Sequence, residues 1–126
     1  MKERRPVGKD EYLYRRGYNK PEHNYMNPDG TATSRVFKLR EKDNGELSVE
    51  VKSLTTPEIA IVDKKRYFLF EISNAEVCQI EGLGTYHDPI HSEEYSNDAH
   101  AVIIGITCQN DVIPGLLARK SRRVVV

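Results

Sequence analysis

The apolar residues of this chain occur in short clusters separated by turn-forming residues, and this spacing constrains the fold more than any other feature. Tyr67–Phe70 and Ala101–Ile104 are clusters of strand length. No apolar run approaches the roughly 20 residues that a membrane-spanning helix needs. We therefore expect short strands and short helices around one core, without a transmembrane segment. The length of 126 residues is sufficient for one such domain.

Two segments alternate polar and apolar residues, which is the pattern of strands with one solvated face. They are Arg35–Arg40 and Glu46–Val51. Between them, Asp43–Gly45 supplies residues that tolerate the positive φ angles of a tight turn. The sequence therefore predicts a β-hairpin from about Val36 to Val51.

The remaining predicted elements are short and of mixed type. Thr55–Glu58 has the Thr, Pro and Glu residues of a helix start, so a short helix should end before Asp63. Further predicted elements are strands over 66–72 and 101–106, a helical turn capped by Ser73-Asn74, a strand end over 85–89, a helix from Asp111 to about Lys120, and a last strand over 123–126. Such helices are too short for regular crossovers between parallel strands. We therefore predict a single α+β domain with a mostly antiparallel or mixed sheet and two or three short helices.

Residues 1–33 carry little hydrophobic periodicity and many turn formers. We therefore interpret them as an irregular N-terminal arm, with one short ordered piece around Tyr12–Arg16, in front of a domain over 34–126. The arm interleaves aromatic and basic side chains. Tyrosine faces can stack on unpaired bases while Arg and Lys contact phosphate, but Tyr and Arg also anchor protein interfaces. The arm could equally dock onto its own domain. The predicted nucleic-acid-binding or partner-binding residues are Tyr12, Tyr14, Arg15, Arg16, Tyr18 and Lys20.

Acidic and basic residues balance overall but are segregated along the chain. There are 19 Lys or Arg residues and 19 Asp or Glu residues. Residues 1–42 hold eleven basic and six acidic side chains, whereas 71–100 hold seven acidic and no basic ones. Either the basic N-terminal part lies across the acidic part, or the two form separate surfaces, one for a polyanion and one for a partner protein or metal.

The cysteines and the N-terminal sequence indicate an intracellular protein. Cys78 lies in an apolar helix-like segment and Cys108 lies just after a strand-like segment, which favours small buried thiols over a disulfide. The first residues are charged and lack the apolar stretch of a secretory signal. We therefore expect a cytoplasmic location.

Three of the four histidines, His87, His91 and His100, lie close together in the chain. With Asp88 they offer nitrogen and oxygen ligands for a metal ion. However, Pro89 prevents a regular helix that would carry His87 and His91 on one face. We therefore predict no metal site and no cofactor.

The same histidines could supply an acid and a base for phosphoester chemistry, since imidazole moves protons near pH 7 and guanidinium neutralises phosphate. Arg15, Arg16 and Arg35 are candidates for that second role. If the protein is an enzyme, the predicted catalytic residues are His87, Asp88, His100 and Arg16. Alternatively, His100 is a hydrogen-bonded structural histidine at the start of a buried strand.

Common catalytic and nucleotide-binding motifs are absent from the sequence. Residues 29–34 contain hydroxyls and one glycine, but neither phosphate-loop spacing nor the required lysine. Residues 81–84 are too short for a dinucleotide fingerprint. No serine occurs in a G-x-S-x-G context, so the commonest hydrolase signal is missing.

The order of several short motifs resembles a family of small prokaryotic proteins of unknown function. The pattern consists of Arg15-Arg16, Asp29-Gly30-x-x-x-Ser34-x-x-Phe37, Leu47-Ser48-Val49, Asp88-Pro89 and Ala99-His100-Ala101. The resemblance implies a stand-alone prokaryotic protein and no particular activity. It points to Arg16, Ser34, Phe37 and His100, and thereby adds Ser34 to the candidate catalytic residues.

Three functions are open at this point. Small size, an aromatic and basic arm that lacks its own core, and the absence of a specific catalytic motif favour a non-enzymatic accessory or interaction module. It would belong to a larger prokaryotic assembly and work with a larger protein partner. The first alternative is a small histidine- and arginine-dependent enzyme that acts on phosphoesters, nucleotides or RNA. The second is a protein that binds single-stranded nucleic acid through the N-terminal arm.

Overall fold

A computed structural model describes residues 4–126, and its main feature is an antiparallel sheet of seven strands. The strand order is β1-β5-β8-β3-β2-β4-β9, and every neighbouring pair is antiparallel. The strands are β1 (Arg5–Pro6), β2 (Tyr12–Tyr18), β3 (Glu46–Val51), β4 (Tyr67–Ser73), β5 (Gly84–His87), β8 (His100–Ile104) and β9 (Arg122–Val124). A small second sheet pairs β6 (Ile90–His91) with β7 (Ser96–Asn97).

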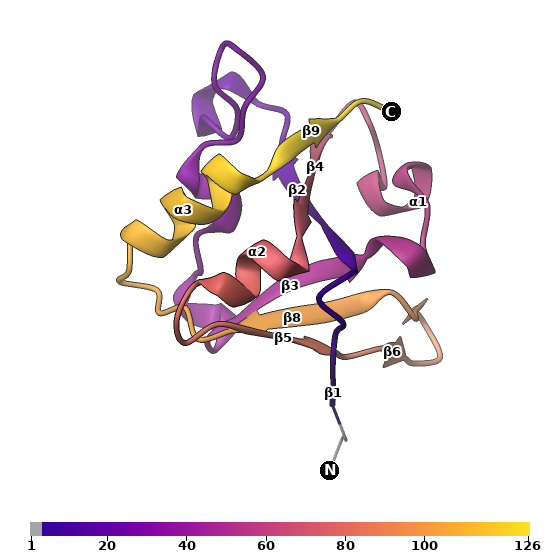
Figure 1. The fold of residues 1–126 in the computed structure, drawn as a ribbon. Coiled ribbons are helices and arrows are strands. Elements are labelled where there is room, and N and C mark those ends of the chain that lie inside the picture. Colours follow the sequence, from indigo (N-terminus) through magenta and orange to yellow (C-terminus); the bar gives the residue numbers. More distant parts are fainter. Residues whose placement is uncertain (1–3) are drawn as a thin grey trace.

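The helices are short and lie on both sides of the sheet. The α-helices are α1 (Pro57–Ile61), α2 (Asn74–Gln79) and α3 (Val112–Lys120), and the 3-10 helices are η1 (Pro21–His23), η2 (Ser34–Phe37), η3 (Glu41–Asp43) and η4 (Lys52–Leu54). In Figure 1, α2 and α3 lie on one side of β2 and β4, and α1 lies on the other. None of the helices in the described part of the chain has the length and apolar character needed to cross a membrane. The expected α+β class is thus confirmed.

The main core lies between the sheet and the helices α2, α3 and η2. Because neighbouring residues of a strand point to opposite faces, alternate positions of β2, β3, β4 and β8 all contribute to this face. Its largest buried side chains include Leu13, Phe37, Leu47, Phe70, Ile72, Val77, Ile103 and Leu117. On the opposite face, α1 covers only a small cluster made of Tyr14, Ala60, Ile61 and Leu69. The middle of that second face therefore remains open for polar side chains.

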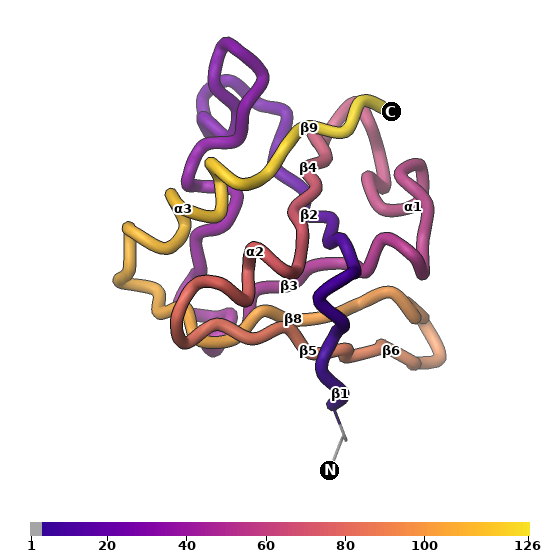
Figure 2. Tube along the Cα trace, viewed as in Figure 1, coloured from indigo at the N-terminus to yellow at the C-terminus, as the bar shows by residue number. Residues whose placement is uncertain are grey.

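Strands β2 and β3 diverge after a short paired stretch. They pair only at Leu13–Val51 and Tyr14–Glu50, whereas β2 pairs with β4 along its whole length. In Figure 1, β3, β8 and β5 run across the lower part of the molecule while β4 and β9 rise steeply from them. The trace in Figure 2 shows the two edge strands, β1 and β9, at opposite ends of the sheet. The divergence opens the sheet beside the second half of β2.

The segment expected to be an irregular arm is instead part of the sheet. Tyr12–Tyr18 forms β2, which lies between β3 and β4. Leu13 is fully buried in the main core, and Gly17 allows Tyr25 and Val36 to pack against the strand, since a Cβ there would meet both within 3.2 Å. The pairing of β2 joins segments far apart in the sequence, so local composition could not reveal it.

The predicted β-hairpin is wrong in its first half. Val36 and Phe37 belong to the 3-10 helix η2, where both side chains are fully buried, whereas a strand with one solvated face would bury only one of the two. The strand Glu46–Val51 is confirmed, but its partners are β8 and β2. Asn44 and Gly45 have the expected positive φ angles, and they connect η3 to β3.

Most of the other local predictions are confirmed. The Thr56 hydroxyl accepts a hydrogen bond from the Ile59 amide at the start of α1, which ends at Ile61. The side chain that caps α3 is that of Asn110, because its Oδ1 accepts from the amides of Val112 and Ile113. Asp111, from which the helix was predicted to start, makes no such bond. Both cysteines are free thiols, and both are half-buried.

Candidate active site

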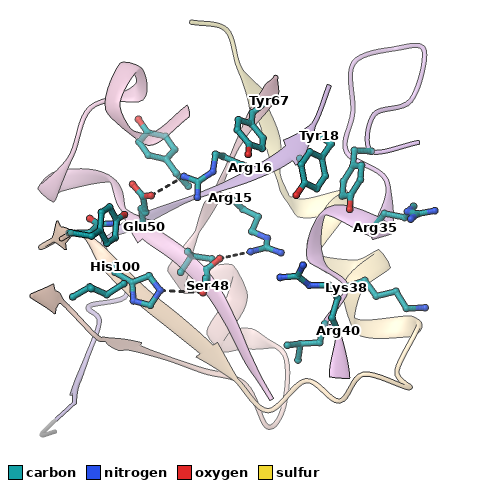
Figure 3. Close-up of a pocket in the computed structure, with 18 residues that line it drawn as sticks. Arg15, Arg16, Tyr18, Arg35, Lys38, Arg40, Ser48, Glu50, Tyr67 and His100 are labelled. Carbon is teal, nitrogen blue, oxygen red and sulfur yellow. Dashed lines mark hydrogen bonds and ion pairs between the residues drawn. The ribbon is translucent and has the colours of Figure 1, made fainter. Parts of the chain in front are cut away.

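A pocket of about 710 Å³ opens where β2 and β3 diverge (Figure 3). Its floor is formed by β2, β3 and the start of β8, and its rim is formed by the chain around η2 and by the β6–β7 hairpin. Its lining residues are Tyr14, Arg15, Arg16, Gly17, Tyr18, Tyr25, Arg35, Lys38, Leu39, Arg40, Ser48, Val49, Glu50, Tyr67, Ile90, Tyr95, Asn97 and His100. The volume is within the range of about 300–1,000 Å³ that small-molecule sites occupy.

The pocket is strongly basic. Among residues 4–126, five Arg or Lys side chains line it, against a single carboxylate, Glu50. All five come from the basic N-terminal third of the sequence. The fold therefore gathers part of the excess positive charge of that segment in one pocket. Lys38 and Arg40 form ion pairs with Asp111 and Asp43, which do not line the pocket. A concave surface of this charge attracts anions and raises their local concentration.

Arg15 bridges the gap between the diverging strands. Its Nε donates to the Val36 carbonyl oxygen and its Nη1 donates to the Ser48 carbonyl oxygen, both at 2.8 Å. Within residues 4–126 no ion pair joins it to a carboxylate, but the charge of Asp43 acts on it at longer range. Burial, and then the neighbouring Arg16, lower the pKa of Arg15 to about 10, which still leaves the guanidinium charged at neutral pH. Its remaining donors can therefore bind an anion in the pocket.

Arg16 is held by one carboxylate and one carbonyl. Its Nη1 lies 3.0 Å from Glu50 Oε1 and donates to the Ala60 carbonyl oxygen at 2.6 Å. Glu50 is nearly buried on the open face of the sheet, and the ion pair fixes the guanidinium against it. Because a guanidinium carries five N–H donors, Arg16 keeps donors beyond those on Nη1 for a ligand.

The imidazole of His100 lies between Asp88 and Ser48. His100 Nδ1 lies 2.8 Å from the Asp88 carbonyl oxygen and 3.5 Å from the Asp88 carboxylate oxygen Oδ2. His100 Nε2 lies 3.2 Å from the Ser48 hydroxyl. Asp88 is buried, and Arg4 also contacts its carboxylate, at 3.5 Å. The order is that of an acid, a base and a nucleophile, with a backbone carbonyl as the nearest partner of the base.

The hydrogen bonds of His100 define which ring nitrogen carries the proton. A carbonyl oxygen only accepts, so Nδ1 must donate to Asp88. In the neutral imidazole, Nε2 is then an acceptor that faces the Ser48 hydroxyl. Ser48 is exposed to the pocket. The geometry thus places a base within reach of a hydroxyl on the floor of a basic pocket.

The predicted site residues divide into those that the fold brings together and those that it does not. Arg15, Arg16, Tyr14, Tyr18 and His100 line the pocket, and Asp88 lies directly behind His100. The remaining predicted residues, Tyr12, Lys20, Ser34 and His87, do not line it. His87 pairs in register with Ala101, the residue next to His100, and therefore points to the opposite face of the sheet. Its Nε2 contacts the Asp98 carbonyl oxygen.

Several residues of the pocket carried no recognised signal in the sequence. Glu50, Tyr67 and Tyr95 were not predicted, and Ser48 was part of a resemblance motif without an assigned role. Strand alternation placed Ser48 on the solvated face of its strand, which is the available signal. Phe37, the other residue that the motif emphasised, is fully buried in the main core. Its role is packing.

The comparisons and the metal-ligand geometry add no assignment. Within residues 4–126, no group of three or more His, Cys, Asp or Glu side chains is placed to hold a metal ion. His91, a candidate ligand in the sequence, is exposed and pairs with Asp98. Comparison with protein-family models, curated proteins and solved structures found no match. The resemblance to small prokaryotic proteins stays a prediction.

Proposed function

We propose that the protein is a small enzyme that cleaves a phosphate ester in the basic pocket, with Ser48 as nucleophile and His100 as base. The observation that supports this most directly is the contact between His100 Nε2 and Ser48 Oγ at 3.2 Å. A nucleophile and a base within hydrogen-bond reach, with the base oriented by a third group, is the arrangement of covalent catalysis. The basic lining favours a phosphate over a neutral ester.

The reaction proceeds in two steps, transfer of the phosphoryl group to Ser48 and hydrolysis of the phosphoserine. The Ser48 hydroxyl oxygen forms a bond to phosphorus while the bond from phosphorus to the leaving oxygen breaks, and the hydroxyl proton passes through His100 to that oxygen. Water then attacks the phosphoserine, and the Ser48–phosphorus bond breaks. His100 takes a proton from the water and returns one to Ser48. The products are an alcohol and a phosphate, and the enzyme is regenerated.

Two arginines of β2 hold the phosphate during both steps. Arg15 and Arg16 start on opposite faces of the strand, and both line the pocket because Arg15 lies in the gap between β2 and β3. Within residues 4–126, Arg15 and Arg16 each have donors beyond those that bind protein acceptors, and Arg15 is fixed next to the Ser48 backbone. Guanidinium groups stabilise the charge that spreads over the phosphoryl oxygens in the transition state. Asp88 acts as a positioning residue, because it contacts His100 and lies outside the pocket.

Turnover assays with phosphomonoesters, phosphodiesters and nucleotides test the proposal. Ser48→Ala and His100→Ala should each lower kcat by at least about a hundredfold, which is the low end of what a general base contributes. Ser53→Ala and His91→Ala are matched controls, because both side chains are exposed and neither lines the pocket. The controls should retain activity. Turnover that survives in Ser48→Ala would refute the assigned nucleophile.

An accessory role beside a larger protein is a second candidate, favoured by apolar side chains around α1. Leu54, Ile59 and Val62 are 50, 68 and 66% exposed, and exposed apolar groups of this size favour protein contacts. Native mass spectrometry of the protein purified gently from its host should then find a bound protein, which Ile59→Ser releases. A bare monomer in the unaltered protein would contradict this role.

A further inference from the structure

Aromatic rings surround Tyr18 at the end of the pocket away from Ser48. The Tyr18 ring centroid lies 5.4 Å from that of Tyr67, 5.5 Å from that of Tyr25 and 5.9 Å from that of His23. These rings come from β2, from β4 and from the chain between the start of η1 and η2. Tyr18 is nevertheless 43% exposed. Tyr18, Tyr25 and Tyr67 line the pocket, and Tyr25 and Tyr67 also pack against the two core clusters, which fix them beside the more exposed Tyr18.

Guanidinium groups lie against the same rings. The Cζ atoms of Arg16 and Arg66 lie 5.8 and 5.7 Å from the Tyr67 ring centroid, and Arg35 Cζ lies 5.6 Å from that of Tyr25. Sites that bind single-stranded nucleic acid combine aromatic faces, on which bases stack, with cations that follow the phosphates. The Tyr18 end of the pocket has both components.

The cationic groups lie where phosphates attached to such a base would reach. In Figure 3, Arg15 and Arg16 lie between the tyrosines and the Ser48–His100 pair. Arg35, Lys38 and Arg40 follow one side of the pocket. Arg35 has no carboxylate partner within residues 4–126. The pocket therefore offers one aromatic surface and at least two separate positions for phosphate.

We infer that the ligand of this pocket is a nucleotide whose unpaired base stacks on Tyr18 and whose phosphates contact Arg15 and Arg35. The inference rests on the proposed function, which supplies the phosphate that reacts at Ser48. Stacking uses the face that every base has, so the site accepts different bases. A nucleoside triphosphate and a single-stranded RNA both offer this chemistry.

Binding of four probes to the full chain with Ser48→Ala tests the inference without turnover. The probes are an oligouridylate, an abasic oligomer of the same length, UTP and inorganic triphosphate, measured by calorimetry. Each base-bearing probe should bind about tenfold more tightly than its base-free counterpart, because stacking contributes about 1–3 kcal/mol per base. The tighter of the two base-bearing probes identifies the source of the nucleotide.

Tyr18→Leu removes the aromatic face and keeps an apolar side chain. The affinity of this variant for the base-bearing probes should therefore fall to its affinity for the base-free probes. Tyr12→Leu is the matched control, since Tyr12 lies on the same strand, is also 43% exposed and does not line the pocket. It should change nothing. Equal binding of base-bearing and base-free probes, or equal effects of the two variants, would overturn the inference. Failure of the catalytic proposal would appear separately, as turnover that survives Ser48→Ala.

Discussion

His100 Nε2 lies 3.2 Å from the Ser48 hydroxyl oxygen, across the pair of strands β3 and β8. The two residues are far apart in the sequence, and the register that pairs Ser48 with Val102 and Glu50 with His100 brings their side chains to the same face. The Asp88 carbonyl fixes the imidazole from its other side. The arrangement therefore depends on the pairing of β3 with β8 and on the backbone position of Asp88.

Arg15 should contribute to stability as well as to ligand binding. Replacing Arg15 by Met keeps the length of the side chain but leaves the carbonyl oxygens of Val36 and Ser48 without their donors. The bond to Val36 is partly buried and the bond to Ser48 is exposed. An unsatisfied buried acceptor costs about 1–3 kcal/mol, so the free energy of unfolding should fall by about 1–2 kcal/mol. Urea denaturation measures the change.

Arg119→Met is the control for this substitution, because Arg119 is exposed on α3. Its effect should stay within about 0.5 kcal/mol, as for most surface substitutions. A similar, small effect of both variants would show that Arg15 does not hold the diverging strands together.

Glu71 should make the protein sensitive to acid. Burial raises the pKa of Glu71, but hydrogen bonds from Arg122 and Lys52 outweigh burial, so that the pKa is lowered overall. A lowered pKa in the folded state stabilises the protein above the unfolded pKa of about 4.3, and this contribution is lost as the pH falls through the folded value.

Glu71→Gln removes that titration, so its free energy of unfolding should be lower than that of the unaltered protein at pH 7, and the difference should shrink below about pH 4. Glu93→Gln, at an exposed position, controls for the loss of one negative charge. Thermal denaturation between pH 7 and 3 provides the comparison. A difference that does not change with pH would contradict the assignment.

Two glycines should respond in opposite ways to alanine. Gly105 has a φ of +108°, and a Cβ there would overlap the carbonyl oxygen of Gly82. Gly105→Ala should therefore lower the free energy of unfolding by about 2 kcal/mol or more. Gly115 lies inside α3 with open space around it. Gly115→Ala should raise the free energy of unfolding by up to about 1 kcal/mol. If both substitutions changed the free energy of unfolding in the same direction, the backbone conformation assigned to one of the two glycines would be wrong.

The elements that the sequence predicts correctly are those defined by local signals. The Thr56 cap and the following proline define α1, and the apolar run of Ala101–Ile104 indicates β8 whatever its neighbours are. An ordered piece was predicted around Tyr12–Arg16, but its place as strand β2 inside the sheet was missed, because its pairing with β3 and β4 joins distant segments. Val36 and Phe37 of η2 were assigned to a strand because the mixture of polar and apolar residues over 35–40 resembles an alternating pattern. The two residues are in fact consecutive buried residues of a 3-10 helix.

The candidate site divides in the same way. Residue chemistry alone identified Arg16, Asp88 and His100, which the fold brings to or directly behind one pocket. Ser48 could not be selected from the other exposed serines, because its proximity to His100 follows from the pairing of β3 with β8. The same pairing sends His87 to the opposite face, although His87 and His100 looked equivalent in the sequence.

Activation of Ser48 by His100 can be measured directly without knowing the substrate. A fluorophosphonate reacts with activated serine hydroxyls, and peptide mass spectrometry identifies the modified residue and its rate. Ser48 should be labelled much faster than the exposed Ser53, and His100→Ala should slow labelling of Ser48 by at least about a hundredfold while the protein remains folded. Labelling of Ser48 at the rate of Ser53, or labelling that does not depend on His100, would contradict the activation of Ser48 by His100.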